Sequence, residues 1–114
     1  MPKSKPPAGL PPAYRALRQR LAQVGWLALG SLIERGLPGQ GGPRYQWSRR
    51  VGAKTVTMAL SREQFEWLQA AVANQREAWD ILAKMQKLTA QYMLENLPNP
   101  PRRKRLNKRN LGLN

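Results

Sequence analysis

Residues 44–60, RYQWSRRVGAKTVTMAL, alternate bulky and polar side chains on both sides of the pair Gly52 and Ala53. Alternation with a period of two predicts a half-buried strand, and two such runs separated by two residues predict a β-hairpin. Gly52 can supply the positive φ that the first central position of a type II′ turn requires. Counting outward from this turn places Tyr45 opposite Leu60.

The predicted register separates the hairpin side chains by chemistry, because successive residues of a strand point to opposite faces. The apolar face holds Tyr45, Trp47, Val56, Met58 and Leu60. The polar face holds Arg44, Gln46, Ser48, Arg50, Thr55 and Thr57. Arg49 is the exception, since it falls on the apolar face near the turn and must snorkel or reach a partner. We expect Tyr45 and Trp47 to be core residues rather than base-stacking platforms.

A long helix is predicted to follow the hairpin directly. Ser61 and Gln64 have the spacing of a capping box, with Ser61 as the N-cap. No Pro or Gly occurs between this box and Leu97, and Pro98 then ends the helix.

An amphipathic helix with a basic outer side is predicted before the hairpin. Its apolar residues recur at helical spacing after Pro12, and they are Tyr14, Leu17, Leu21 and Val24. The apolar run 26–35 fits either a strand or a continuing helix, and we favour a short strand around residues 31–35. The fold class is therefore α+β. We expect a flexible Pro-rich arm over residues 1–12, a single domain over 13–97 and a disordered basic tail over 98–114.

Two largely apolar stripes run along the predicted long helix. The first comprises Phe65, Leu68, Val72, Trp79 and Leu82; the second comprises Trp67, Ala71, Asn74, Ala78, Ile81, Met85, Leu88 and Tyr92. We expect the first stripe to pack on the sheet and the first helix. The row Ile81, Met85, Leu88 and Tyr92 is predicted to be a protein interface with another copy or another protein. Alternatively, the first helix folds back and covers this row.

The composition excludes most enzyme classes. Without histidine the chain lacks the commonest general base, and without cysteine it has no thiolate metal site. We predict no catalytic residue, metal or cofactor. No apolar segment is long enough for a transmembrane helix or a secretory signal, which predicts no membrane partner and a cytoplasmic protein associated with the nucleoid or a ribonucleoprotein.

The charge indicates a polyanionic partner. Twenty Lys and Arg against six Asp and Glu give a net charge of +14, far more than solubility requires. The long helix is nearly neutral, whereas the hairpin, the first helix and the tail are basic. Candidate phosphate contacts are Arg15, Arg18, Arg44, Arg49, Arg50, Lys54, Arg102, Arg103, Lys104, Arg105, Lys108 and Arg109. The tail could instead be a solubilising segment or an address signal, and the polar hairpin face could be an ordinary solvated surface.

Three segments resemble a family of small uncharacterised bacterial proteins that are often encoded near transposases. They are residues 30–35, GSLIER; residues 42–57, GPRYQWSRRVGAKTVT; and residues 60–64, LSREQ. The family usually carries a cysteine cluster before the hairpin, whereas residues 37–43 here read LPGQGGP. The resemblance therefore implies an accessory protein of a mobile element or a nucleoprotein complex, and it implies no metal site.

The expected function is non-catalytic binding of DNA or RNA as an accessory subunit of such a complex. The alternative is a protein-interaction or inhibitor module that sets its positive charge against an acidic protein surface or occupies a nucleic-acid channel. Steep weakening of binding with salt would indicate phosphate contacts, at about 0.9 log units per contact for duplex DNA.

Deletion of residues 101–114 should weaken binding to duplex and single strands alike and should lower the salt dependence of binding, because a basic tail supplies charge and no base readout. Affinity measured for both kinds of strand over a series of salt concentrations tests this expectation. An unchanged salt dependence after truncation would remove the tail from the binding surface.

Overall fold

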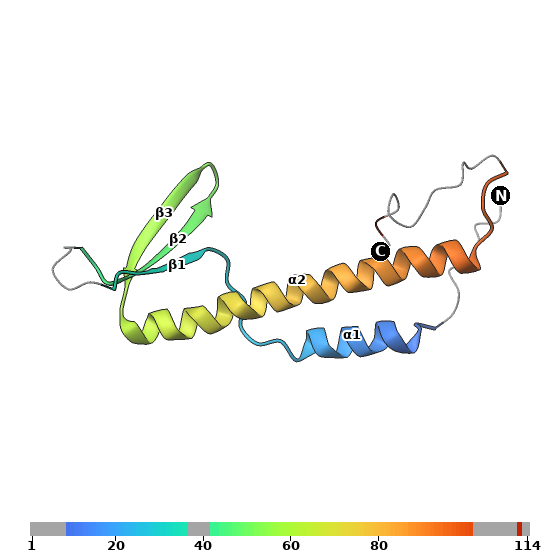
Figure 1. Ribbon diagram of the computed structural model, residues 1–114, viewed down its shortest axis with the longest axis horizontal. Helices are drawn as coiled ribbons and strands as arrows, with labels where there is room; N and C mark the ends of the chain where they lie inside the picture. The colour runs from blue at the N-terminus through green and yellow to red at the C-terminus, as the bar shows by residue number, and fades with distance from the viewer. Residues whose placement is uncertain (1–8, 37–41, 102–111, 113–114) are drawn as a thin grey trace. The chain divides into compact units, whose positions relative to one another are not determined.

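The computed structural model describes residues 9–36, 42–101 and 112. Its elements, in chain order, are α1 (Pro12–Ala22), β1 (Ser31–Glu34), β2 (Tyr45–Val51), β3 (Lys54–Leu60) and α2 (Arg62–Asn96) (Figure 1). The predicted α+β class and order of elements are confirmed. Most of the predicted arm and of the predicted basic tail lies outside the described residues.

The three strands form one antiparallel sheet in the order β1-β2-β3. The predicted hairpin register is confirmed from Tyr45 opposite Leu60 to Val51 opposite Lys54. Gly52 has a φ of +63°, and no described residue other than glycine has a positive φ. The turn therefore has its positive φ at the first central position, as a type II′ turn requires.

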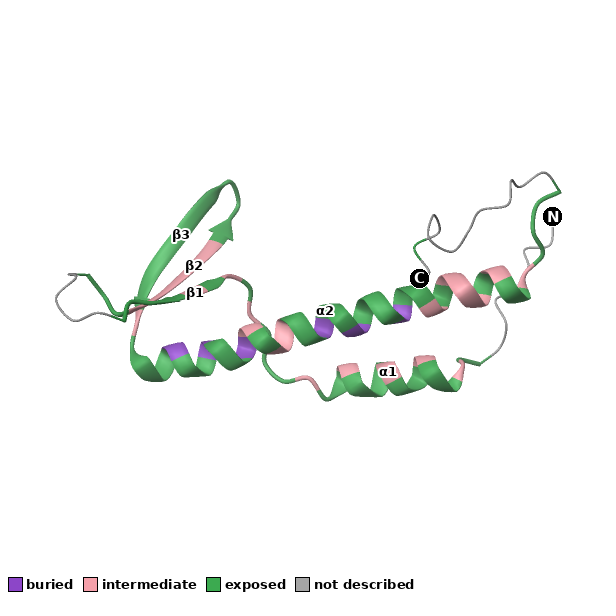
Figure 2. Ribbon diagram, in the orientation of Figure 1, coloured by how far each residue is buried: buried purple, intermediate pink, exposed green. Residues whose placement is uncertain are grey.

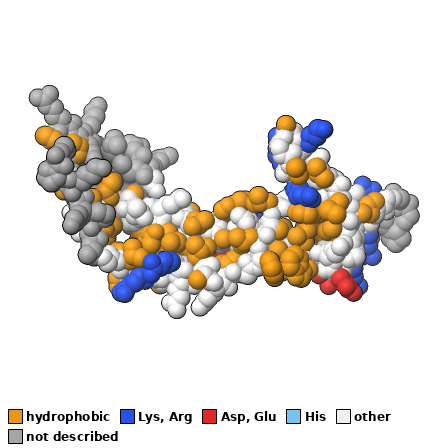
Figure 3. Space-filling model, turned by 180° about the vertical axis from the view of Figure 1, so that it is seen from behind, with side chains coloured by type: hydrophobic (Ala, Val, Ile, Leu, Met, Phe, Trp, Pro, Cys, Tyr) orange, Lys and Arg blue, Asp and Glu red, His pale blue; other side chains and the backbone are white. Residues whose placement is uncertain are grey.

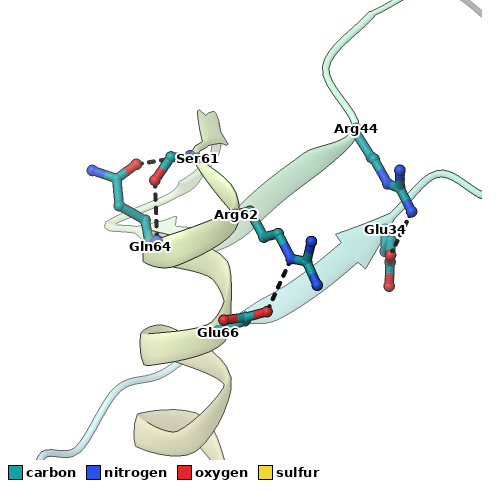
Figure 4. Close-up of polar contacts among 6 residues, drawn as sticks. All are labelled: Glu34, Arg44, Ser61, Arg62, Gln64 and Glu66. Carbon is teal, nitrogen blue, oxygen red and sulfur yellow. Dashed lines mark hydrogen bonds and ion pairs between the residues drawn. The ribbon is translucent and has the colours of Figure 1, made fainter.

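The two helices begin at residues whose chemistry suits a helix start. At α2 the Ser61 hydroxyl accepts a hydrogen bond from the Gln64 amide at 3.0 Å, and the Gln64 side-chain oxygen accepts one from the Ser61 amide at 3.0 Å (Figure 4). This reciprocal pair is the predicted capping box. α1 begins at Pro12, where the missing N–H is not needed and the fixed φ suits a helix.

The chain divides into two compact units that share α2. We call Val24–Ala78 the sheet unit, since it contains the three strands and the first part of α2. The other, which we call the helical unit, contains α1 and the part of α2 from Trp79 onward. A single domain over residues 13–97 stays a prediction.

The core of the sheet unit lies where the apolar sheet face meets the start of α2. Phe65, Leu68 and Ala71 are buried on this part of the helix (Figure 2). The ring of Tyr45 lies 4.7 Å from that of Phe65, measured between centroids. The predicted contact of the first stripe with the sheet is therefore correct for Phe65.

The core of the helical unit uses the second stripe instead of the first. α1 runs beside the later part of α2 (Figure 1), where Ile81 is fully buried and Met85 is buried. Leu88 and Tyr92 are half-buried, as are Tyr14, Leu17 and Leu21 of α1. Trp79 and Leu82 of the first stripe remain exposed.

The prediction of an exposed interface row is therefore wrong for Ile81 and Met85. The alternative, in which the first helix folds back over the row, describes the structure. The physical reason is the periodicity of the helix: one short helix can cover only one line of side chains, and α1 covers the second stripe in this half of α2.

No helix in the described part of the chain combines the length and the hydrophobicity needed to cross a membrane. α2 has 35 residues, but charged side chains recur along it.

Ile81→Ala should lower the free energy of unfolding by about 2 to 5 kcal/mol, since it leaves a cavity in the only fully buried position described. Leu82→Ala, at the neighbouring position that is 39% exposed, is the matched control and should cost far less. Urea denaturation followed by circular dichroism compares the two variants. Equal losses would contradict the burial of Ile81 beneath α1.

Candidate nucleic-acid interface

The polar face of the sheet carries a row of hydroxyl groups that crosses all three strands. The strand pairing places Ser31 beside Ser48 and Ser48 beside Thr57, and the Thr57 hydroxyl donates to the Ser48 hydroxyl at 3.2 Å. A shallow groove of about 380 Å³ follows this row, and its lining residues are Leu29, Gly30, Ser31, Ser48, Arg49, Arg50 and Thr55. The lining thus contains no acidic residue, and Arg50 is its cation on the polar face of the sheet.

The cations at the turn end of the hairpin differ from Arg44 at its other end. Arg50 and Lys54 are exposed, and within the described ranges no ion pair joins either of them to an acid. The Arg44 guanidinium instead lies 3.4 Å from the Glu34 carboxylate. An exposed pair of this kind is weak, but it partly offsets the charge of Arg44. The turn end is therefore the more electropositive part of the hairpin.

Arg49 has its partner within the hairpin. Its guanidinium carbon lies 4.1 Å from the centroid of the Trp47 ring, and its Nη1 lies 3.7 Å from the Met58 sulfur. A cation over an indole face is attracted by the ring quadrupole. The side chain thus covers apolar surface, and its guanidinium lies with Trp47 and Met58 on the apolar face of the hairpin.

Trp47 itself is held from the segment before β1. Its indole Nε1 donates a hydrogen bond to the Leu29 carbonyl at 2.8 Å. Gly30 has a φ of +119°, and a Cβ there would lie 2.5 Å from the Trp47 Nε1 and 2.6 Å from the Ser48 carbonyl oxygen. Only glycine fits this position. The sequence reasoning missed this contact, although a glycine directly before a predicted strand is a signal for close backbone approach.

The apolar side of the same unit is not fully covered. A groove of about 490 Å³ lies between the hairpin and the start of α2, lined by Trp47, Met58, Leu60, Glu63, Gln64, Trp67 and Leu68. Trp67 is 56% exposed, and its ring lies 5.9 Å from that of Trp26, which is 73% exposed. Figure 3 shows hydrophobic side chains gathered below the hairpin, with Lys and Arg on the hairpin itself. Trp47 is half-buried rather than a closed core residue.

Hydrogen bonds to α2 hold the segment that carries Trp26 and Leu29. The Asn74 side-chain amide donates to the Trp26 carbonyl at 3.0 Å, and the Ala28 amide donates to the Ala71 carbonyl at 3.2 Å. Asn74, the polar member of the second stripe, therefore satisfies a backbone carbonyl in this segment. The same contacts keep the Leu29 carbonyl in reach of Trp47.

The described acidic side chains of the sheet unit do not form a cluster. Glu66 accepts a hydrogen bond from Arg62 Nε at 3.1 Å (Figure 4), and this contact raises the pKa of Arg62. Arg62 therefore stays charged, but its charge is paired. No group of three or more His, Cys, Asp or Glu that could hold a metal ion occurs among the described residues.

The remaining predicted cations lie elsewhere. Arg15 and Arg18 are exposed on α1 and belong to the helical unit, so they are not part of the sheet surface. Leu88 and Tyr92 of the predicted interface row line a pocket of about 240 Å³ with Leu10 and Tyr14 in that unit. The tail cations lie outside the described residues, and they are Arg102, Arg103, Lys104, Arg105, Lys108 and Arg109.

Comparison with family models, with curated proteins and with solved structures finds no significant match for this chain. The resemblance to the family encoded near transposases stays a prediction from the sequence.

Gly30→Ala should lower the free energy of unfolding by about 1 to 3 kcal/mol or more, because alanine must adopt the positive φ and its Cβ meets Trp47 and Ser48. Gly36→Ala is the matched control, since nothing lies within 4 Å of a Cβ there and its φ is not positive. Urea unfolding followed by tryptophan fluorescence compares them. A Gly30 variant as stable as the control would show that the Trp47 contact is not needed.

Proposed function

We propose that the protein is a non-catalytic nucleic-acid-binding subunit of a larger nucleoprotein complex. Phosphates would lie against the turn end of the polar sheet face. The observation that carries this proposal is the groove in which Arg50 stands beside the hydroxyls of Ser31, Ser48 and Thr55 with no acid among the lining residues.

The chemistry of this groove suits phosphate oxygens. Most protein contacts to nucleic acid go to the phosphate and sugar, from Arg, Lys and hydroxyl side chains as well as backbone amides. Arg50 and the hydroxyl groups supply two of these side-chain types along the polar face, and Lys54 adds a second cation at the turn. A two-stranded ribbon such as β2-β3 is also narrow enough to enter the major groove of B-DNA.

The other cations would add to binding through their charge. Arg15 and Arg18 on α1 and the cations of residues 102–109 would add phosphate contacts without base readout. The resemblance to proteins encoded near transposases supports a mobile-element complex as the setting. Both DNA and RNA fit the proposal, since the proposed contacts use the backbone that the two share.

A protein-interaction or inhibitor module is the second candidate, and the apolar groove favours it. The exposed Trp26 and Trp67 are of the residue type that anchors protein interfaces. The two candidates differ in their response to salt, because release of counterions from a polyelectrolyte makes phosphate binding fall steeply with the logarithm of salt concentration.

Arg50→Ala with Lys54→Ala should weaken binding of a labelled 20-base-pair duplex and lower the slope of log affinity against log salt by up to about 1.8, for two phosphate contacts. Both side chains are exposed, so the melting temperature should hardly change. Fluorescence anisotropy at several salt concentrations measures affinity and slope.

The matched control is Arg76→Ala with Lys84→Ala, which removes the same charge from exposed positions of α2. This control should lower the affinity for the duplex, and the slope of log affinity against log salt, much less than Arg50→Ala with Lys54→Ala. Equal losses in the two double variants would mean that only total charge matters, and the sheet-face site would then be abandoned.

A further inference from the structure

β3 is an edge strand with an open side. It pairs with β2 alone in the sheet, and its residues from Lys54 to Ala59 are exposed. A β-turn joins its first and last residues by a hydrogen bond, here Val51 and Lys54, and amide directions alternate along an antiparallel strand. The amides and carbonyls of Thr55, Thr57 and Ala59 therefore point away from β2.

This edge lacks the features that commonly protect an edge strand from pairing with another chain. Such features are charged side chains, proline, bulges and very short strands. β3 has seven residues, its pairing with β2 is continuous, and its only charge is Lys54 beside the turn. Residues 55–60 thus offer a regular, uncharged edge.

The side chains of β3 match in pairs when two copies of the strand run antiparallel about Thr57. Antiparallel pairing of two copies around this residue places Thr57 opposite Thr57, Val56 opposite Met58, and Thr55 opposite Ala59. Apolar side chains then meet on the apolar face and small or hydroxyl side chains meet on the polar face, as favourable cross-strand pairs require. Thr57 is also one of the residues whose amide points outward, so the central pair can exchange both hydrogen bonds.

We propose that two copies of the chain associate through β3, which pairs antiparallel with itself about Thr57 to form one continuous six-stranded sheet. This inference does not depend on whether the protein binds nucleic acid. It identifies the partner of the open edge as a second copy.

Apolar area supports a second copy as the occupant. Leu60 of β3 lines the apolar groove together with Trp47 and Met58. Met58, which is 44% exposed, and Val56 would become covered. A standard interface buries about 800 Å² on each partner, and the adjoining groove with Trp67 extends the apolar surface beyond the strand itself.

The absence of cysteine from the chain allows a direct test of this register. A disulfide requires Cα atoms closer than about 7 Å. In the proposed pair, opposed Thr57 residues have Cα atoms about 5.5 Å apart, whereas two Thr55 residues are separated by four residue steps, about 14 Å. Thr57→Cys should therefore form covalent dimers under mild copper-catalysed oxidation. Thr55→Cys protein alone should form at least tenfold less covalent dimer. A mixture of Thr55→Cys and Ala59→Cys protein should cross-link, because these two positions lie opposite each other in the proposed pair.

The experiment uses full-length protein that has been freed of nucleic acid by nuclease and high salt, so that a shared polyanion cannot bridge two copies. Sedimentation of the wild type should show a concentration-dependent dimer. A wild type that stays monomeric up to about 100 μM would overturn the proposal. A dimer in which Thr57→Cys cross-links no better than Thr55→Cys would overturn it too, since the copies would then meet elsewhere.

A second pair of variants separates backbone pairing from side-chain effects. Thr57→Pro removes the outward donor, and proline is tolerated in an edge strand where its nitrogen faces solvent. The dimer loses two donors, one from each copy, so its dissociation constant should rise by about ten- to a hundredfold. Thr57→Val keeps the amide and the β-branch and should dimerise like the wild type. A folded Thr57→Pro protein, checked by circular dichroism, that dimerises as tightly as Thr57→Val would overturn the proposal.

Discussion

The hydrogen bond from the Trp47 indole to the Leu29 carbonyl is the interaction on which the sheet unit depends. A half-buried indole N–H needs a partner, and the backbone before β1 supplies it. Because the indole comes so close to the chain at Gly30, the contact sets where β1 begins and brings Leu32 opposite Trp47. The ring then lies beneath Arg49 and lines the apolar groove. One side chain thus joins the segment before β1, Arg49 and the apolar groove.

The apolar face of the sheet is only partly covered by the rest of the unit. Three strands present a whole apolar face, but the buried side chains described in this unit are few and lie on α2, at Phe65, Leu68, Ala71 and Ala78. A core this small provides limited stability, and in small domains further burial often comes from association. The exposed pair Trp26 and Trp67 and the groove beside it are the surface that remains.

The features that could be predicted from the sequence are those determined by neighbours in the chain. The register of β2 and β3 follows from a two-residue turn, and the start of α2 follows from Ser61 and Gln64. The features that could not be predicted depend on contacts between distant segments. Trp47 and Leu29 are 18 residues apart, and Asn74 and Trp26 are 48 apart.

In the helical unit, the prediction that the first stripe of α2 packs on the first helix is wrong for the same reason. Both stripes are apolar, and only the position of α1 decides between them. The pairing of Arg44 with Glu34 likewise joins β1 to the residue before β2, and neither residue type indicates that contact. Periodicity predicts which side chains share a face, but it does not predict which segment covers that face.

The two proposals reinforce each other through the symmetry of an antiparallel strand pair. A two-fold axis through Thr57 and normal to the sheet keeps the polar faces of both copies on one side. The hydroxyl row of Ser31, Ser48 and Thr57 would then run on into the same row of the second copy. Each copy contributes its own Arg50, so the polar face of the dimer would carry twice as many cations as that of one copy. No like charges would meet at the two-fold axis. Two modest phosphate sites on one rigid sheet bind a polyanion more tightly than either site alone. The apolar grooves, on the opposite side, would stay clear of the phosphates and free to contact protein.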